Sequence, residues 1–467
     1  MKLLTRIIVT MGLSTSVLAD DLLIKLASPV STEKTVQTMN FKGMNARQIM
    51  PQWISIQGNI KSSQFQSYLA SGTILHVQPN YKLNIFSNPS LAKARQNKAL
   101  VQYIQKMNIG TTAKLADNPP IPNAPANVNG ADPLYSKQWG MVDNGLENAL
   151  KINGGQKMIV AVIDTGVDYT HEDLLPNMWR NTNEIPDNGI DDDKNGFVDD
   201  IVGWDFLKND NKPYDLASTD LGDIINGGNP GHGTHCAGNV GARGNNGKGI
   251  SGVHPTAEIM ALRFIGDEGG STTGAIGAIR YAVDNGAKVL SNSWGSEGED
   301  PAEAADNLAL QEAIQYAMDK NVLFIAASAN SGKDNDKDPK RAFPASYPHD
   351  NIISVAAIDS KNGLASFSNY GATSVDIGAP GVKIFSTTVG NNYSDTVIEL
   401  FGANWDGTSM ACPHVAGAAA LYWSAHPEKT WQQVKAAILS SAKPIPSLKG
   451  KTLTGAKLSV EELMKVN

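Results

Sequence analysis

The sequence predicts an α/β fold with three layers, in which a mostly parallel central sheet lies between helices. Apolar runs of strand length alternate with runs of helical character, an order typical of parallel sheets covered on both faces. Small apolar residues from Val415 to Tyr422 can pack tightly as a helix inside the core. A shorter stretch with mixed strand and helix patterns precedes this part. The expected strands of the sheet are 159–163, 258–263, 288–291, 322–327 and 352–357.

Composition and charge set the broad class of the protein. A chain of 467 residues corresponds to two or three structural units. With 41% hydrophobic and 18% charged residues, the chain is too apolar for a disordered protein. The net charge of -7 does not favour nucleic acid or an anionic membrane as a partner.

The first nineteen residues have the pattern of an export signal. Lys2 and Arg6 precede the apolar run from Ile7 to Leu18, and Val17-Leu18-Ala19 is a small-residue cleavage site. The run is too short to span a bilayer, and no later run is long enough. We therefore expect a protein without a membrane span, exported to the extracellular space or the periplasm, and monomeric. A retained N-terminal anchor is the alternative.

Residues 20–88 are expected to form a small α+β unit, with strands at 22–26 and 74–81 and a helix at 62–69. About 65 residues is marginal for independent stability, so this unit is expected to fold against a partner. The interval 89–130 is predicted to hold an exposed amphipathic helix over 89–107 and a stiff Pro-rich linker over 117–125. An unrelated N-terminal domain is the alternative interpretation of residues 20–88.

Three motifs contain the residue types of a nucleophilic triad. Asp164 ends an apolar strand and is followed by a glycine turn, at the sheet edge where ligands usually bind. His232 lies in Gly-His-Gly-Thr-His, and Ser409 lies in Gly-Thr-Ser-Met-Ala-Cys-Pro-His. A hydroxyl at a helix N-terminus lies beside free N–H groups that favour developing negative charge. Pro413 lacks an N–H, so a helix through this motif leaves the Ser409 carbonyl without its usual partner.

In this order, the three motifs resemble the signature of the subtilisin-like serine peptidases, whose triad also runs Asp, His, Ser along the chain. The resemblance is continuous from about Asp132 onward and loose over residues 20–88. It implies a catalytic domain of subtilisin-like fold over 131–467, preceded by an inhibitory propeptide domain. Asp164 would orient and stabilise His232, His232 would act as the base, and Ser409 would attack the carbonyl.

The resemblance also implies an activity. The expected protein is a serine endopeptidase of protein or peptide substrates, made as a self-processing precursor that its own propeptide inhibits. The cleavage position could lie anywhere from the end of the propeptide to the linker. A catalytically silent binding protein, an exopeptidase and a transferase on the same fold are the alternatives.

Further site residues are assigned through the same resemblance. Asn330 matches the asparagine that donates to the oxyanion, and Ala329 stands where the family commonly has glycine, so its methyl could narrow the primary pocket or tilt Asn330. The substrate would bind as an added strand between two walls of the cleft. The first wall is formed by Ser293, Trp294 and Gly295, and the second by Ala327, Ser328 and Ala329.

Acidic residues follow the first wall in the sequence. They suggest either a solvated loop or a preference for cleavage after basic residues, and they are Glu297, Glu299 and Asp300.

An acidic stretch between residues 187 and 200 predicts a structural Ca²⁺ site. Its spacing reproduces the opening of an EF-hand-type loop, but the closing Glu is missing because position twelve is Val202. A second, less specific calcium site resembles one found in the family and involves Asp173 and Asn246. The ligands expected at the first site are Asp187, Asp191, Asp193, Asn195, the Phe197 carbonyl, Asp199 and Asp200.

The two cysteines and a second histidine lie within the motifs. Cys236 and Cys412 are expected behind the site, as buried small side chains or as a disulfide, and the sequence leaves both open. His235 is expected to face inward as a structural histidine.

Overall fold

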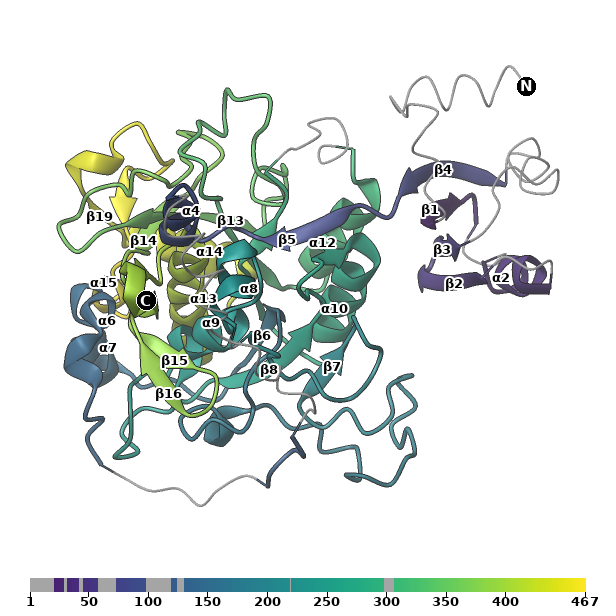
Figure 1. Cartoon of the computed structure of the whole chain (residues 1–467), viewed down its shortest axis with the longest axis horizontal. Helices are drawn as coiled ribbons and strands as arrows, with labels where there is room; N and C mark the ends of the chain where they lie inside the picture. The colour runs from purple at the N-terminus through teal and green to yellow at the C-terminus, as the bar shows by residue number, and fades with distance from the viewer. Residues whose placement is uncertain are drawn as a thin grey trace.

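The computed structural model shows a large α/β body and a small sheet-and-helix unit beside it (Figure 1). The predicted export signal, the predicted helix at 62–69, residues 98–107 of the predicted amphipathic helix, and Glu299 and Asp300 lie outside the described residues. The structure describes residues 21–28, 32–41, 45–57, 73–97, 119–123, 130–218, 220–297 and 306–467.

A nine-stranded sheet forms the centre of the body, counted over the described residues. Its strands pair in parallel, except for the antiparallel edge pair β19–β20. The predicted mostly parallel sheet is therefore confirmed, with all five expected strands present to within one residue at each end. In spatial order the strands are β19 (Lys443–Pro444), β20 (Ala456–Lys457), β14 (Ile377–Pro380), β13 (Ile352–Ile358), β12 (Leu323–Ala327), β10 (Val289–Asn292), β6 (Ile159–Asp164), β8 (Glu258–Arg263) and β7 (Gly203–Asp205).

Helices cover both faces of this sheet, and the alternation of side chains along each strand explains why. Val160 and Val162 of β6 belong to the apolar cluster that contains the inner faces of α9 and α13. Ala161 and Ile163, which point the other way, belong to the cluster that contains α10 and α12. The helices are α9 (His232–Gly241), α13 (Thr408–Ala425), α14 (Trp431–Ser440) and α15 (Val460–Leu463) on the first side, and α10 (Thr272–Asp284) and α12 (Leu308–Asp319) on the second.

The small unit is a four-stranded antiparallel sheet with one described helix. Its strand order is β2-β3-β1-β4, and its core is a separate apolar cluster that includes Ile24, Ile54 and Val77. Two of these strands, β2 and β3, carry no clear signal in the sequence and were not predicted. The elements are β1 (Asp21–Leu26), α2 (Thr32–Phe41), β2 (Asn45–Met50), β3 (Trp53–Gln57) and β4 (Ile74–Pro79).

The small unit contacts the beginnings of α10 and α12, where helix N–H groups lack partners within the helix. Gln78 accepts a hydrogen bond from the Ala309 N–H at 3.0 Å, and Asn80 accepts one from the Thr273 N–H at 2.9 Å. Glu312 of α12 also binds Lys25 and the Trp53 indole, at 2.5 and 2.8 Å.

The segment after β4 differs from the prediction. The expected strand 74–81 ends at Pro79, and a new strand, β5 (Lys82–Ile85), crosses the face of the body and leads into α4 (Pro89–Arg95) (Figure 1). Proline lacks the N–H that a continued ladder needs, which fits the break at this point. The expectation that the helix after residue 89 is exposed is wrong for its described part, because Leu91 is only 3% exposed.

Shorter elements complete the described part of the body, and no helix in that part is long and apolar enough to cross a membrane. They are η2 (Tyr135–Lys137), α6 (Trp139–Asp143), α7 (Leu146–Ile152), η3 (Leu175–Asn177), α8 (Leu221–Asn226), β9 (Gly270–Ser271), β11 (Trp294–Gly295), β15 (Ser386–Thr388), β16 (Asn392–Ser394), β17 (Thr396–Ile398), η4 (Glu399–Phe401), β18 (Ala403–Asn404) and η5 (Pro446–Leu448).

Candidate active site

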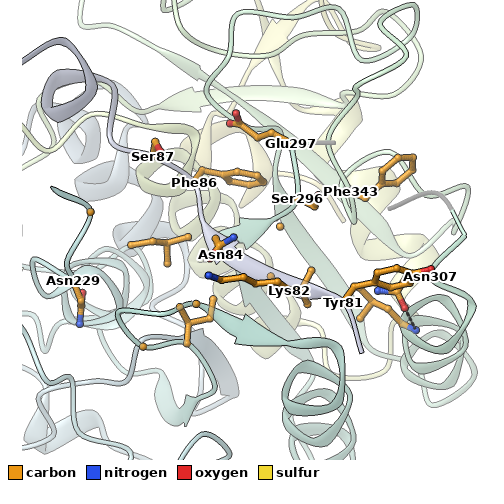
Figure 2. A pocket seen from close by; sticks show the side chains of 18 of the residues that line it. Tyr81, Lys82, Asn84, Phe86, Ser87, Asn229, Ser296, Glu297, Asn307 and Phe343 are labelled. Carbon is orange, nitrogen blue, oxygen red and sulfur yellow. Dashed lines mark hydrogen bonds between the residues drawn. The ribbon is translucent and has the colours of Figure 1, made fainter. Parts of the chain in front are cut away.

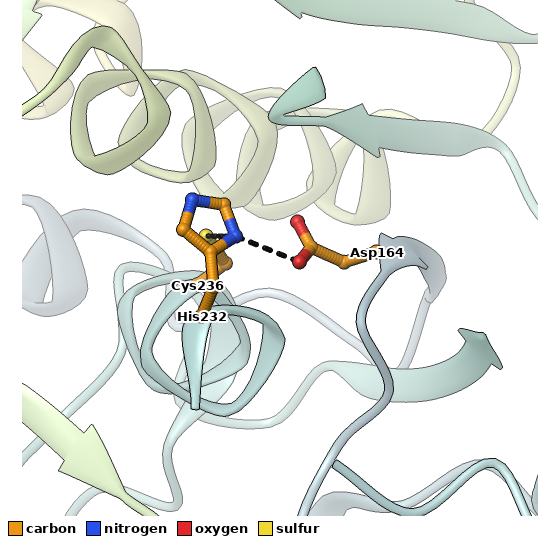
Figure 3. Close-up of side chains that lie close together, drawn as sticks. All are labelled: Asp164, His232 and Cys236. Atoms are coloured by element: carbon orange, nitrogen blue, oxygen red, sulfur yellow. Dashed lines mark hydrogen bonds and ion pairs between the residues drawn. The ribbon is translucent and has the colours of Figure 1, made fainter. Parts of the chain in front are cut away.

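The carboxyl end of β6 and the first turn of α9 bring Asp164 and His232 together. Asp164 is the last residue of β6, and its Oδ1 lies 2.7 Å from Nδ1 of His232, the first residue of α9 (Figure 3). Asp164 Oδ1 also accepts the Thr165 N–H at 2.8 Å, while the buried His232 Nε2 has no partner among the described residues. The carboxylate therefore fixes the Nδ1–H tautomer, which leaves Nε2 as a proton acceptor.

Asp215, which the sequence analysis did not identify, holds these two elements at their separation. Its carboxylate accepts hydrogen bonds from Thr165 Oγ1 at 2.9 Å and from both the N–H and the hydroxyl of Thr234, at 2.9 and 2.7 Å. Thr165 Oγ1 in turn accepts the Gly233 N–H at 2.9 Å. Asp215 belongs to neither motif and lies 50 positions from Thr165 and 19 from Thr234 in the sequence. Its role is therefore visible only in the folded chain.

Ser409 is the second residue of α13. Its backbone carbonyl accepts hydrogen bonds from side chains and not from a helix N–H. Pro413 lies inside the helix, so no N–H at that position can reach the Ser409 carbonyl. Ser293 Oγ donates to that carbonyl at 2.9 Å and Cys236 Sγ donates at 3.4 Å. The Ser409 hydroxyl itself donates to the Ser293 carbonyl at 3.2 Å. These contacts join α13, β10 and α9 at one point.

The Asn330 side chain is oriented by Thr408, the residue before Ser409. Its Oδ1 accepts the Thr408 N–H and the Thr408 hydroxyl, both at 2.9 Å. Since a backbone N–H donates and the amide oxygen is the acceptor of the Asn330 side chain, this contact assigns the orientation of the amide. Nδ2 donates to the Ser87 carbonyl at 3.1 Å. The amide that the sequence assigned to the oxyanion therefore contacts a peptide carbonyl of the chain itself.

Glu297 positions the same asparagine from the other side. Its Oε1 accepts the Asn330 N–H at 3.0 Å, and its Oε2 contacts the Ser331 hydroxyl. The two sequence-based interpretations of this acid, a solvated loop residue or a determinant of basic specificity, both missed this contact. Sequence offered no signal for it, because the two segments meet only in the folded chain.

Strand β5 lies in the cleft as an added strand. It pairs antiparallel with β11 on one side, where Ile85 faces Trp294 and Asn84 faces Gly295, and with β9 on the other, where Leu83 faces Gly270. A cavity of about 340 Å³ follows this strand (Figure 2). Of the predicted walls, Trp294 and Gly295 contact this strand through the backbone, while Ser293 holds the Ser409 carbonyl.

Phe86, at the end of β5, places its ring against Gly295. The Phe86 side chain is only 4% exposed, and a Cβ added to Gly295 would come within 2.7 Å of its ring. The same apolar cluster contains Ala327 and Ala329 of the second predicted wall. The absence of a side chain at Gly295 therefore leaves the space that an aromatic ring fills here.

Ala329 has a backbone conformation that suits glycine. Its φ is +83°, which costs a residue with a Cβ roughly 1–2 kcal/mol. Its N–H donates to the Thr408 hydroxyl at 3.1 Å, so the network that orients Asn330 also holds this residue in place. The two effects considered for the extra methyl, a narrower pocket and a tilted Asn330, stay predictions.

Both cysteines lie behind the site as free, buried thiols. Cys412 Sγ contacts the Asn292 and Ile325 carbonyls, and burial raises the pKa of the Cys412 thiol to about 12. His235 contacts the Ile384 carbonyl through Nε2 at 2.9 Å, and burial lowers its pKa to about 3. It therefore faces inward and stays neutral, as expected of a structural histidine.

The acidic loop brings together only part of the predicted ligand set. Asp193 and Asp200 approach Glu184, which was not predicted, with one oxygen of each carboxylate within 4.8 Å of the others. Asn195 donates to both Asp193 and Asp200, at 3.2 and 2.9 Å. Burial raises the pKa of the Asp200 carboxyl, against hydrogen bonds that lower it. Three carboxylates this close fit a divalent cation with oxygen ligands.

The remaining predicted ligands serve the loop itself. Asp199 accepts the N–H groups of Asn188 and Gly189, and Asp191 accepts those of Asn195 and Gly196. Asp187 is exposed and lies outside the carboxylate group. The Phe197 ring packs against Trp204, Phe206 and Tyr281, which anchors the loop to α10.

At the second predicted calcium position, the structure brings Asp173 and Asn246 together. Asn246 Nδ2 donates to Asp173 Oδ1 at 2.8 Å, and the Ile250 N–H donates to Oδ2 at 2.8 Å. Asp132, missed in the sequence, accepts the N–H groups of Asn245 and Asn246. Burial raises the pKa of the Asp132 carboxyl, and the nearby charge of Asp173 adds to this shift.

Comparison with known proteins identifies the family. The model of the subtilase family matches residues 155–460, well over half of the chain. The chain is 36% identical over 342 residues to the thermophilic serine proteinase of Bacillus sp. (strain AK1), covering 73% of this chain and 67% of that protein. It is 35% identical over 316 residues to thermitase of Thermoactinomyces vulgaris, covering 67% and 91%. The chain belongs to the subtilase family of serine peptidases, and it is a hydrolase.

A solved structure shows the same fold. The crystal structure of fervidolysin from Fervidobacterium pennivorans, described as a keratinolytic enzyme related to subtilisin, aligns with a TM-score of 0.64 at 24% identity. The alignment covers 96% of this chain and 61% of that one, so this chain spans about three fifths of the fervidolysin structure. The predicted subtilisin-like fold is confirmed.

Proposed function

We propose that this protein is an exported serine endopeptidase that cuts peptide bonds through Ser409, His232 and Asp164. The Ser409 hydroxyl attacks the carbonyl carbon, and His232 Nε2 takes the hydroxyl proton and passes it to the leaving amine. The acyl group on Ser409 is then released by water, which gives its proton to the same Nε2. Asp164 holds the ring through Nδ1 and stabilises its charged form, while Asn330 Nδ2 and the Ser409 N–H donate to the oxyanion.

One observation carries this proposal. The polypeptide passes through the cleft, with β5 bound as a strand on one side of the active centre and α4 bound on the other. Ser87, between them, has its carbonyl 3.1 Å from Asn330 Nδ2. A cleft open at both ends admits an internal peptide bond, which favours an endopeptidase over an exopeptidase. A catalytically silent binding protein is not favoured. Such a protein would not need the hydrogen bond between Asp164 and His232 or the contact that orients Asn330.

The same arrangement supports residues 20–88 as an inhibitory propeptide. A strand that fills the cleft excludes other substrates, and the contacts of the small unit with α10 and α12 hold it there. The ladder of β5 with β11, continued by one residue, places Phe86 opposite Ser293, beside Ser409. Two bonds are candidates for the first self-cleavage: Phe86–Ser87 by this register, and Ser87–Asn88 because the Ser87 carbonyl contacts Asn330.

The proposal is tested by letting the full chain process itself and sequencing the new N-termini. A new terminus at Ser87 or at Asn88 is expected, and the one observed identifies the bond that is cut. The processed protein is then given an unfolded protein substrate, and the product termini are mapped. Internal cuts are expected. Release of single residues or dipeptides alone would show an exopeptidase, and absence of any cleavage would contradict the proposal.

We further propose that Glu184, Asp193 and Asp200 hold a structural Ca²⁺, with Asn195 beside them, and that Asp173, Asn246 and Asp132 form a second site. Unpaired, the carboxylates of the first group repel one another at a few ångström, and salt screens this repulsion poorly at such distances. Bound Ca²⁺ supplies the compensating positive charge and keeps the loop between Glu184 and Asp200 closed.

Removal of Ca²⁺ is expected to lower the stability of the folded protein. Binding to the folded state alone stabilises it by about 2.7 kcal/mol at a hundredfold excess over Kd. In the unfolding temperature this corresponds to a decrease of several degrees in chelator, since 1 kcal/mol shifts a domain of this kind by roughly 2–4 °C. Differential scanning calorimetry with and without chelator measures the shift.

The matched variants are Asp193→Asn combined with Asp200→Asn, and Asp187→Asn as the control outside the carboxylate group. The double variant should lose the part of the response to chelator that comes from the first site, whereas Asp187→Asn should keep the whole response. An equal response in all three proteins would place the Ca²⁺ elsewhere.

A further inference from the structure

Helix α4 is seated in an apolar pocket beyond the active centre. Leu91 is the one buried side chain of α4, and it packs among Ile224 and Ile225 of α8 and Ile398 and Ala403 of the β17–β18 hairpin. All four of these pocket residues are themselves buried beneath the helix. Helix α4 lies at the end of β5 that is far from β4 (Figure 1), the direction in which the leaving half of a cut polypeptide would run.

Polar contacts position the same segment around the pocket. Asn88 Nδ2 donates to the Asn404 carbonyl at 3.0 Å, and Ser90 Oγ contacts the Asp406 carboxylate. Asp406 immediately precedes Gly407 and Thr408, the start of the motif that carries Ser409. Arg95 contacts the Ile225 carbonyl at the far end of the helix. The pocket is therefore fixed at a defined distance from the active centre.

We propose that this pocket is a substrate-recognition site that selects an aliphatic side chain four residues beyond Ser87, on the leaving-group side of the cut. Leu91 occupies it in the uncut chain. After processing at either candidate bond Leu91 remains on the enzyme, and an aliphatic residue of a protein substrate binds in exchange for it. This inference rests on the proposed endopeptidase function and adds to it a preference on the far side of the cleft.

The way α4 is held supports a substrate site over ordinary core packing. Leu91 is the one buried residue of α4, Lys93 is exposed, and the other helix residues are half-buried. The pocket walls come entirely from elements of the body, α8 and the β17–β18 hairpin, and they remain in the enzyme whichever bond is cut. A hydrophobic pocket of this kind discriminates between side chains by about 10–200-fold.

The test uses the full chain after self-processing and quenched fluorescent peptides that span residues 81–96. The peptide with Leu91→Ser is expected to lose about tenfold in kcat/KM, mainly through KM, because the pocket binds ground state and transition state alike. The peptide with Lys93→Ser, changed on the exposed side of the helix, is expected to stay within twofold of the native sequence.

An enzyme variant completes a double-mutant cycle. With Ile225→Ser in the enzyme, the native and Leu91→Ser peptides should be cut at rates within twofold of each other. Ile398→Ser provides an independent second wall variant should Ile225→Ser not fold.

Two results would overturn the proposal, and they are distinguishable. Equal cleavage of the native and Leu91→Ser peptides by an active enzyme would show that the pocket serves only to seat α4, and would leave the proposed function intact. Failure to cut any peptide or any unfolded protein would remove the proposed function and this inference with it.

Discussion

Replacement of Ser409 by alanine is expected to lower kcat for peptide hydrolysis by about 10⁶-fold and to leave the full chain uncut. The size is that known for loss of the nucleophile in subtilisin, a related enzyme. In the proposed mechanism the Ser409 hydroxyl is the nucleophile that attacks the carbonyl carbon. Without it, the backbone N–H donors and substrate binding give only slight residual catalysis. The measurement is the initial rate on a peptide substrate, with gel electrophoresis of the precursor over time.

A control variant separates chemistry from folding. Ser441 is the residue that follows α14, and its hydroxyl donates to the Ile438 carbonyl of that helix at 3.3 Å. Ser441→Ala should therefore process itself and hydrolyse peptides at the native rate. Self-processing of Ser409→Ala at the native rate would remove Ser409 from the mechanism.

Replacement of Asn330 by leucine is expected to lower kcat by about 10²–10³-fold with little change in KM, the range known for the equivalent donor in subtilisin. Leucine has a similar shape but no N–H to offer to the oxyanion, whose charge develops only in the transition state. The structure adds a second expectation. Thr408 fixes the amide through two hydrogen bonds, at 2.9 Å each.

Thr408→Val, which keeps one of these two bonds, should therefore lower kcat by a smaller factor, about tenfold, by loosening the amide. The kinetic constants of both variants are measured on the same peptide. A loss confined to KM, or a larger loss in Thr408→Val than in Asn330→Leu, would show that Asn330 binds substrate and does not stabilise the oxyanion.

Most of the sheet and the residues around Ser409 could be predicted from sequence because their signals are local. The five predicted strands of the body are apolar runs. Asp164 ends one of them and precedes a glycine turn, and His232 follows Gly231, whose φ is +92°. Even the unpaired Ser409 carbonyl follows from Pro413 alone, since proline has no N–H. What the sequence did not indicate was which groups would satisfy it, because Ser293 and Cys236 reach it only through tertiary packing.

The residues that were missed share a physical reason. Glu297, Asp215 and Asp132 contact residues 33, 19 and 113 positions away in the sequence, so no local spacing marks them. Glu184 lies close to the acidic stretch but before its alternate spacing begins. The acidic loop illustrates this directly. The alternate spacing of its carboxylates suggested ligands to one ion, but several of them fold back to accept N–H groups of their own loop. Short polar side chains often compete in this way for nearby backbone donors.

The path of the chain through the cleft could not be predicted from the sequence, for a different reason. Lys82–Ile85 has little strand character of its own, and it becomes a strand because β9 and β11 offer unpaired edges on both sides. The pocket for Leu91 depends in the same way on α8 and the β17–β18 hairpin, which meet only in the folded body.

The most direct test of the central claim, that Ser409 is a nucleophile activated by His232, is covalent labelling. The self-processed protein is treated with a fluorophosphonate, which reacts with activated serine hydroxyls, and the adduct is located by mass spectrometry of the digested protein. A single adduct on Ser409 is predicted. Labelling should be strongly reduced in a His232→Ala chain that native enzyme has first cut in trans, because this variant is not expected to process itself. An adduct on another residue, or labelling of Ser409 at the native rate without His232, would contradict the account.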